Sequence, residues 1–367
     1  MNQESFGKLT KIAINGYKSI NECDLELTTL NVLVGANGAG KSNLLSVLEL
    51  LQSVLSRALA HYAGKKGTET LFYNGKGVTD CIHTEFHFDN DVYSFDLEWT
   101  ENNSLIFRSE SLVMDDNGKE LIGEGGHSES KALNLLRNMS YGIEISKIML
   151  NPGWIIYRFQ NTTASSSKKS EQNISNDAAF MSEGQNLASF LYRLKQSFPM
   201  DYSKILRSVQ RVAPFFDDFV LEPKELNDEQ IILKWKQKGC EEVFNAAQLS
   251  DGTLRFICLA TLLLQPHELQ PTTIIIDEPE LGLHPYTITI FAELVKKVST
   301  RKQIILATQS VELLDHFQPE DVVVVDRTKN GSEFKRLDSD KLAAWLEDDY
   351  SLGELWNKNL FGGRVAR

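Results

Sequence analysis

The chain has 367 residues, 42% of them hydrophobic, which suffices for two domains or for one large domain with an insertion. Fifty acidic and 38 basic residues give a net charge of −12. This excludes a protein whose surface as a whole is cationic and binds nucleic acid or anionic lipid. The four cysteines form no Cys-x-x-Cys pair, so neither a zinc site nor a disulfide framework is predicted. Reduced cysteines and a start without an apolar leader favour the cytoplasm.

The first third of the chain predicts strands on both sides of a helix. Residues 9–20, 23–27 and 32–34 read as strands, and residues 43–62 read as one long helix. Beyond it, residues 81–88, 92–99 and 105–114 alternate apolar and polar side chains between short polar turns. This pattern predicts a meander of antiparallel strands.

The middle third has weaker patterns. Residues 123–129 are glycine-rich, 133–150 are weakly helical, and 160–176 form a polar run that predicts a mobile loop. Between these segments, residues 154–159 predict a strand. Amphipathic helices are expected over 186–198 and 202–212, separated by Pro199, and extended segments over 231–235 and 242–244.

The last third predicts parallel strands alternating with helices. A continuous apolar run over 272–276, of the kind buried on both faces of a parallel sheet, ends in Asp277 and Glu278. A helix over 286–299, a strand over 303–307, a strand over 321–325 and an acidic tail from residue 342 are expected after it.

The strongest motif lies between the strand at 32–34 and the helix that follows it. Its sequence, Gly-Ala-Asn-Gly-Ala-Gly-Lys-Ser-Asn over residues 35–43, matches the phosphate-binding loop Gly-x-x-x-x-Gly-Lys-Ser/Thr. The glycines allow backbone N–H groups to point at a polyphosphate, and the start of the helix adds its positive end. Lys41 is expected to reach the β- and γ-phosphates, and the Ser42 hydroxyl to bind Mg²⁺. The predicted nucleotide contacts are Gly35, Ala36, Asn37, Gly38, Ala39, Gly40, Lys41, Ser42 and Asn43.

A polar turn that opens an apolar helix is the second candidate site. In Leu249-Ser250-Asp251-Gly252-Thr253, the Ser250 hydroxyl and free N–H groups can bind the γ-phosphate held by a second copy of the chain. The alternative is a simple helix N-cap. If the turn acts on a second copy, the active site is complete only in a homodimer.

Five stretches together resemble one family. They are Gly16-Tyr17-Lys18-Ser19, the phosphate loop, the turn at 249–253, the run from Asp277 to Pro285, and Ala307-Thr308-Gln309-Ser310. The chain resembles ABC-type ATPases of the RecF, SMC and OLD group, and most closely the stand-alone, RecF-like bacterial ATPases of the AAA_21 type. The resemblance implies an α/β fold: a P-loop ATPase head with a mixed parallel core sheet, an antiparallel flap and an inserted α/β middle region. The lobes would be residues 1–120 and 241–367, with the insertion at 121–240.

The resemblance also implies roles for single residues. Asp277 would share Mg²⁺ with Ser42, and Glu278 would be the general base; a hard carboxylate for the metal and a second one near the γ-phosphate suit this chemistry. An acidic helix start is the structural alternative. Lys18, Ser250, Asp251 and Gly252 would contact ATP, and Gln309 would take part in catalysis where relatives carry a histidine. Because glutamine cannot become cationic, slow turnover is expected.

Two further departures and a basic patch leave alternatives open. Asp251 and Thr253 stand where transporter-type ATPases have Gly and Gln, and His284 stands in place of their aspartate. His284 matches the pattern of RecF and OLD relatives, and a solvated or packed histidine is the alternative interpretation. For a group of basic residues, solvated surface is the favoured interpretation and a local DNA-binding patch is the alternative. The group consists of Arg193, Lys195, Lys204, Arg207, Arg211, Lys234, Lys236 and Lys238.

The leading hypothesis is an ATP-driven, dimerising switch in DNA maintenance or anti-phage defence. No nuclease domain is expected in this chain, so any effector would be a separate protein. The second hypothesis is a nucleotide sensor that hydrolyses little ATP and scaffolds a nuclease or toxin. A transporter subunit is a weaker third, because the His284-Pro285 pair and the middle insertion disfavour it.

Overall fold

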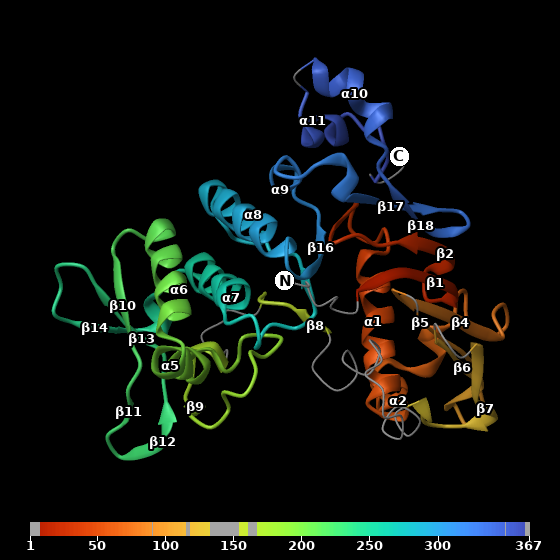
Figure 1. Ribbon diagram of the computed structural model, residues 1–367, viewed down its shortest axis with the longest axis horizontal. Coiled ribbons are helices and arrows are strands. Elements are labelled where there is room, and N and C mark those ends of the chain that lie inside the picture. The colour runs from red at the N-terminus through yellow and green to blue at the C-terminus, as the bar shows by residue number, and fades with distance from the viewer. Residues whose placement is uncertain are drawn as a thin grey trace. The chain divides into compact units, whose positions relative to one another are not determined.

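The computed structural model describes residues 8–89, 91–114, 118–132, 154–160, 167–348 and 350–363 (Figure 1). Contacts divide the chain into two units, Met1–Trp154 with Phe317–Arg367, and Ile155–His316. The lobe boundaries at residues 120 and 240 that the sequence suggests stay a prediction. Among the residues described, no helix is long and apolar enough to cross a membrane. The four cysteines are free thiols.

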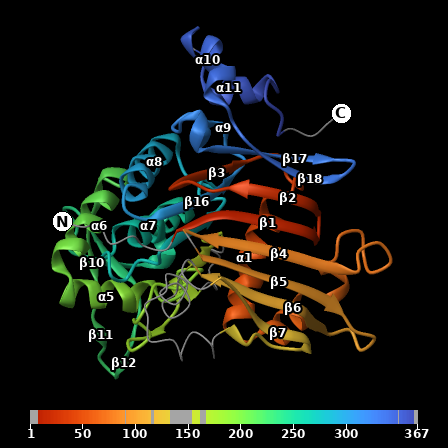
Figure 2. The ribbon, with the colours of Figure 1, turned by 45° about the vertical axis from the view of Figure 1, so that its right-hand side comes forward.

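The first unit contains an antiparallel sheet of six strands, which Figure 2 shows side by side. Its order is β2 (Ile20–Glu26), β1 (Leu9–Tyr17), β4 (Cys81–Phe88), β5 (Asp91–Trp99), β6 (Leu105–Met114) and β7 (Gly118–His127). The predicted meander over 81–114 is confirmed. The glycine-rich run at 123–129 belongs largely to β7, which the sequence did not predict. Gly125 explains its composition, because a Cβ there would lie 2.8 Å from the carbonyl oxygen of Arg108 on β6.

A second group of strands in this unit carries the phosphate loop. The fully buried β3 (Leu30–Val34) pairs in parallel with β17 (Val322–Thr328), which pairs antiparallel with β18 (Gly331–Arg336). Parallel pairing places the carboxyl ends of β3 and β17 at one edge. The loop leaves β3 there and enters α1 (Lys41–Leu55).

One prediction for the first unit is wrong in detail. The expected helix over 43–62 is two helices, α1 and α2 (Leu59–Lys66), followed by η1 (Thr68–Leu71). Arg57 between them has a φ of 56°, which a right-handed helix cannot contain. The expected acidic tail contains α10 (Ser339–Glu347) and α11 (Leu352–Asn357), and η4 (Pro319–Asp321) lies earlier, directly before β17. Acidic residues serve as caps there, since Asp338 accepts from the N–H of Asp340 at the start of α10.

The core of the second unit has parallel strands and long helices. Here β15 (Thr273–Asp277) pairs in parallel with β16 (Gln303–Thr308), Asp277 opposite Ala307, and β8 (Trp154–Tyr157) follows β15 in strand order. The associated helices are α7 (Asp251–Leu264), α8 (Pro285–Ser299) and α9 (Val311–Leu314). These elements confirm the strands and helices predicted for residues 251–308.

The remainder of this unit is an α/β region. Its helices α5 (Leu187–Ser197) and α6 (Pro199–Val212) confirm the two predicted helices, and Pro199 occupies the first turn of α6. Short strands form two small sheets, β10 (Phe216–Val220) with β13 (Lys234–Gln237) and β14 (Val243–Asn245), and β11 (Pro223–Lys224) with β12 (Asn227–Ile231) and β9 (Gln172–Asn173).

The predicted polar loop over 160–176 is only partly testable. Its described part contains η2 (Ser167–Lys169) and β9, so the prediction is wrong there. Another short helix of this unit, η3 (Ala246–Gln248), lies just before α7. The helix predicted over 133–150 lies outside the described residues.

Candidate nucleotide site

The predicted site residues fall into two groups. Lys18 and residues 35–43 belong to the first unit. The second unit contains Ser250, Asp251, Gly252, Asp277, Glu278 and Gln309.

Lys41 is the first helical residue of α1 and is only 5% exposed. Its Nζ donates to the carbonyl oxygens of Gly35 and Ala36, in the latter case at 3.0 Å. These carbonyls offer the ammonium group the oxygen acceptors that a polyphosphate would offer. The strand packs tightly here, since a Cβ at Gly35 would lie 2.4 Å from the carbonyl oxygen of Val325.

A chain of hydrogen bonds braces the phosphate loop. Asn43 Nδ2 donates to Ser19 Oγ at 2.6 Å, and Ser19 shares a 2.7 Å bond with Ser332 Oγ on β18. Ser332 in turn donates to the carbonyl oxygen of Ala39 at 2.6 Å. Because Gly40 has a φ of 125° and its Cβ would lie 2.2 Å from Ser332 Oγ, this position requires glycine.

The end of the described chain also contacts this loop. The N–H of Ala36 donates to the carbonyl oxygen of Gly363 at 2.7 Å, and the N–H of Gly363 donates to Asp326 on β17. Neither the contacts of Ser332 nor those of Gly363 with the phosphate loop were predicted from the sequence.

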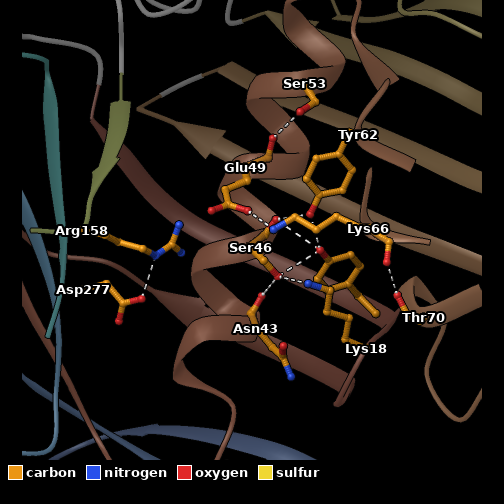
Figure 3. Close-up of polar contacts among 11 residues, drawn as sticks. Lys18, Asn43, Ser46, Glu49, Ser53, Tyr62, Lys66, Thr70, Arg158 and Asp277 are labelled. Atoms are coloured by element: carbon orange, nitrogen blue, oxygen red, sulfur yellow. Dashed lines mark hydrogen bonds and ion pairs between the residues drawn. The ribbon is translucent and has the colours of Figure 1, made fainter. Parts of the chain in front are cut away.

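Lys18 is held against the second turn of α1, as Figure 3 shows. Its Nζ donates to Ser46 Oγ at 2.9 Å, and Tyr17 and Tyr62 direct their hydroxyls to the same residue. Burial raises the pKa of Tyr17 well above its usual range, so the hydroxyl stays protonated and able to donate. The predicted contact of Lys18 with a nucleotide stays a prediction.

The two carboxylates at the end of β15 face different surroundings. Asp277 is buried, whereas Glu278 is partly exposed and has a φ of 50°, a left-handed conformation that is costly for a residue with a Cβ. The N–H of Glu278 donates to the carbonyl oxygen of Ala307 at 2.8 Å, which fixes this turn to β16. Backbone strain of this kind is found at functional sites.

Both carboxylates have partners just after β8 that the sequence analysis missed. Arg158 Nε lies 3.1 Å from Asp277 Oδ2 (Figure 3), and Gln160 Nε2 donates to Glu278 Oε2 at 2.9 Å. The available signal was polar residues at the end of an apolar strand, the same signal that singled out Asp277.

The turn at 249–253 contains the N-cap of α7, as the alternative interpretation of this turn predicts. Ser250 Oγ accepts from the N–H of Thr253 at 3.1 Å and is exposed at the start of α7. A Cβ at Gly252 would lie 2.4 Å from the carbonyl oxygen of Gly282, so the turn packs against the run that follows β15. Asp251 forms an ion pair of 3.1 Å with Lys169.

Gln309 is positioned through its main chain. Its N–H donates to Glu280 Oε1 at 3.1 Å, and burial raises the pKa of that carboxyl. His284 Nδ1 accepts from the N–H of Tyr286 at 3.3 Å, which is the N-cap of α8. His284 is thus an exposed capping residue, in line with its structural reading.

A sequence model of the AAA_21 family, described as "AAA domain, putative AbiEii toxin, Type IV TA system", matches residues 30–315. The chain belongs to this family. No curated protein matches its sequence.

Solved structures are similar in fold over nearly the whole chain. An SmcHead bound to the C-winged helix domain of ScpA is 15% identical with a TM-score of 0.56, covering 92% of this chain and 99% of the other. An Smc head with an extended coiled coil, bound to the C-terminal domain of ScpA derived from Pyrococcus furiosus, is 16% identical with a TM-score of 0.54, covering 93% and 99%. This AAA_21 protein therefore has the ABC-type ATPase head fold of SMC proteins, and the predicted fold class and family resemblance are confirmed.

Half of the eight basic residues in the candidate DNA-binding patch of this family member have oxygen partners among the described residues, and all four of these lie on the middle helices. Four of the five on the middle helices contact oxygen atoms: Arg193 the carbonyls of Asp177 and Ala178, Lys195 Asp218, Lys204 Asp201, and Arg211 Glu293. On β13, Lys234 and Lys236 are exposed on either side of the buried Trp235, so they share a face as predicted. Lys238 lies beyond the end of that strand.

Proposed function

We propose that the chain binds ATP at residues 35–43 and hydrolyses it slowly. The buried ammonium group of Lys41, bonded to loop carbonyls at the start of a 15-residue helix, is the observation that carries this proposal. The first turn of α1 contains no acidic residue, so the positive end of the helix is available to a phosphate group.

The proposed catalytic roles are those that the motifs predict. Asp277 and the exposed Ser42 hydroxyl would share Mg²⁺, because this ion binds one or two carboxylates together with substrate phosphates. Bound Mg²⁺ would offset charge on the β- and γ-phosphates. Glu278, partly exposed and fixed by the turn to β16, would orient the attacking water as general base. Gln309 would contribute its amide near the γ-phosphate.

We also propose that ATP drives homodimer formation. Ser250 is exposed at the N-terminus of the 14-residue helix α7, and Gly252 is partly exposed beside it. Such a helix start can bind the γ-phosphate held by Lys41 of a second copy. ATP binding would then contribute to association by mass action.

The proposed biological role is a switch in DNA maintenance or anti-phage defence, with the effector on a separate chain. The family description, which refers to a toxin of a toxin–antitoxin system, supports a defence role. A DNA contact would depend mainly on Lys234 and Lys236 of β13, because most helix cations are already paired.

The second candidate, a low-turnover nucleotide sensor that scaffolds a nuclease or toxin, has a specific observation in its favour. Arg158 and Gln160 contact Asp277 and Glu278, so both carboxylates have partners other than metal and water. While Arg158 and Gln160 hold the two carboxylates, ATP hydrolysis would be slow, and it would become faster only when these contacts break.

Two measurements test the proposal. Calorimetry should show ATP binding that tightens with Mg²⁺, and phosphate release should be measured alone and with single- or double-stranded DNA. Stimulation by DNA supports the switch, and slow turnover that no DNA changes supports the sensor. Absence of ATP binding by the folded protein would overturn both.

A further inference from the structure

Asp277, the carboxylate proposed to bind Mg²⁺, has a cationic partner within its own unit. Arg158 Nε lies 3.1 Å from Oδ2 (Figure 3). The Asp277 side chain is 8% exposed and that of Arg158 is 35% exposed. A carboxylate this deeply buried needs a compensating charge or donor, and Arg158 supplies both.

The backbone directly after Arg158 is hydrogen-bonded to a side chain of α7. The buried Arg255 of α7 donates from Nε to the carbonyl oxygen of Phe159 and from Nη2 to that of Gln160, each at 3.2 Å. Two such bonds fix the segment that carries Arg158. The ion pair with Asp277 is therefore built into the fold, unlike a pair between two mobile surface side chains.

A guanidinium group and a divalent cation compete for one carboxylate, because their charges repel each other and both require its oxygen atoms. We propose that Arg158 is the resting counter-ion of Asp277, which Mg²⁺ displaces only when ATP phosphates accompany it. The inference rests on the proposed function. It makes Arg158 a positioning residue that keeps Asp277 ordered and prevents occupation of the site by metal alone. Partial exposure gives the released side chain a path to solvent.

The test measures metal dependence rather than turnover. Binding of AMP-PNP, an ATP analogue with a non-hydrolysable β–γ link, is followed by calorimetry across a Mg²⁺ titration. In Arg158→Ala, the Mg²⁺ concentration that gives half of the full effect on AMP-PNP binding should fall about 2- to 5-fold, the scale of one partly exposed ion pair. Binding of AMP-PNP without Mg²⁺ should stay unchanged. Mn²⁺ alone, followed by electron paramagnetic resonance, should bind the variant more tightly by a similar factor.

Matched variants keep the result interpretable. Arg211→Ala removes an arginine of the same unit from an exposed pair with Glu293 and should leave the Mg²⁺ midpoint unchanged. Arg158→Lys keeps a cation and should shift the midpoint less than alanine does. Adding Asp277→Asn to Arg158→Ala should abolish the gain in Mn²⁺ affinity, because the carboxylate is then gone.

Failure of this inference differs from failure of the proposed function. If AMP-PNP binds with a Mg²⁺ dependence that Asp277→Asn removes, but folded Arg158→Ala and Arg158→Lys keep the wild-type midpoint, Arg158 is not the counter-ion. Weaker AMP-PNP binding by Arg158→Ala without Mg²⁺ would also overturn it, since Arg158 would then be a phosphate ligand. No AMP-PNP binding by the wild type would overturn the proposed function itself.

Discussion

Ser332 donates a hydrogen bond of 2.6 Å to the carbonyl oxygen of Ala39, although 293 residues separate them. A hydroxyl group from β18 thus supports the middle of the phosphate loop. Ser19 bonds to both Ser332 and Asn43, so the hydrogen-bonded chain connects Ala39 with Asn43 at the end of the loop. The loop conformation depends on this brace as well as on its own glycines.

Ser332→Ala should weaken ATP binding about 5-fold, because it removes a hydrogen bond worth about 1 kcal/mol from the loop. The matched control is Ser53→Ala on α1, whose hydroxyl donates to the carbonyl oxygen of Glu49 at 2.9 Å, outside the loop. Calorimetry on both folded variants measures the difference. Equal ATP affinities would show that the brace does not preorganise the loop.

Lys41→Ala should reduce ATP affinity about 100-fold or more, since two charge-assisted hydrogen bonds to phosphate are worth about 1.5–3 kcal/mol each. Lys66→Ala provides a control, because it removes a lysine of α2 that pairs with Glu49 of α1 at 3.0 Å, outside the phosphate loop. Normal ATP binding by Lys41→Ala in calorimetry would place the nucleotide elsewhere.

Gln309→His should raise ATP turnover or leave it unchanged. The main chain at this position is fixed by the bond from Gln309 N–H to Glu280, which the substitution retains. A histidine adds a donor that can also carry charge near the γ-phosphate. Steady-state phosphate release is the measurement, with circular dichroism as the check on folding. A large loss of turnover in the folded variant would identify glutamine as the adapted catalytic group.

The sequence predicted the elements whose information is local. The continuous apolar runs of β3 and β15 and the glycines of the phosphate loop each specify a strand or turn through neighbouring residues. The end of α1 was not predicted, because the left-handed Arg57 has no distinctive local signal. The β17–β18 hairpin was not predicted either, although Asn330-Gly331 is a local signal typical of a tight hairpin turn.

The site was predictable as motifs but not as contacts. Arg158 and Asp277 are 119 residues apart, and neither residue type specifies the other as its partner. Only the pairing of strands brings such residues together, and strand order is not encoded locally. The roles assigned to Ser250, Glu278 and Gln309 stay predictions.

Lys302→Met should stabilise the protein at pH 7 by on the order of 1–3 kcal/mol. Burial lowers the pKa of Lys302 from 10.5 to about 8, so folding disfavours its charged form. Between pH 8 and 10.5 the unfolded chain binds more protons at this site, so wild-type stability should rise with pH in that window. The advantage of the variant should therefore be full below pH 8 and shrink toward pH 10.5. Urea unfolding of both proteins at pH 7 and 9.5 measures this stability difference. The same difference at both pH values would contradict a lowered pKa for Lys302.

Glu278→Gln should accumulate an ATP-bound dimer, because the variant loses the general base while Ser42 and Asp277 remain available to the metal. Ser250→Arg, added to that background, should abolish the dimer. Ser250 is exposed at the start of α7, so an arginine there fits the monomer but places a bulky cation where the second copy must approach.

Light scattering with and without Mg-ATP decides between a site completed by a second copy and a site complete in one chain. The decisive pair is Glu278→Gln and Glu278→Gln with Ser250→Arg, both with ATP binding confirmed by calorimetry. Loss of the Ser250 cap costs about 1 kcal/mol of helix stability, so circular dichroism must show that the double variant is folded. If Glu278→Gln stays monomeric with ATP bound, or the double variant still dimerises, Ser250 does not bind ATP across an interface. The low-turnover sensor then becomes the better account, because Asp277 and Glu278 would already have their resting partners within one chain.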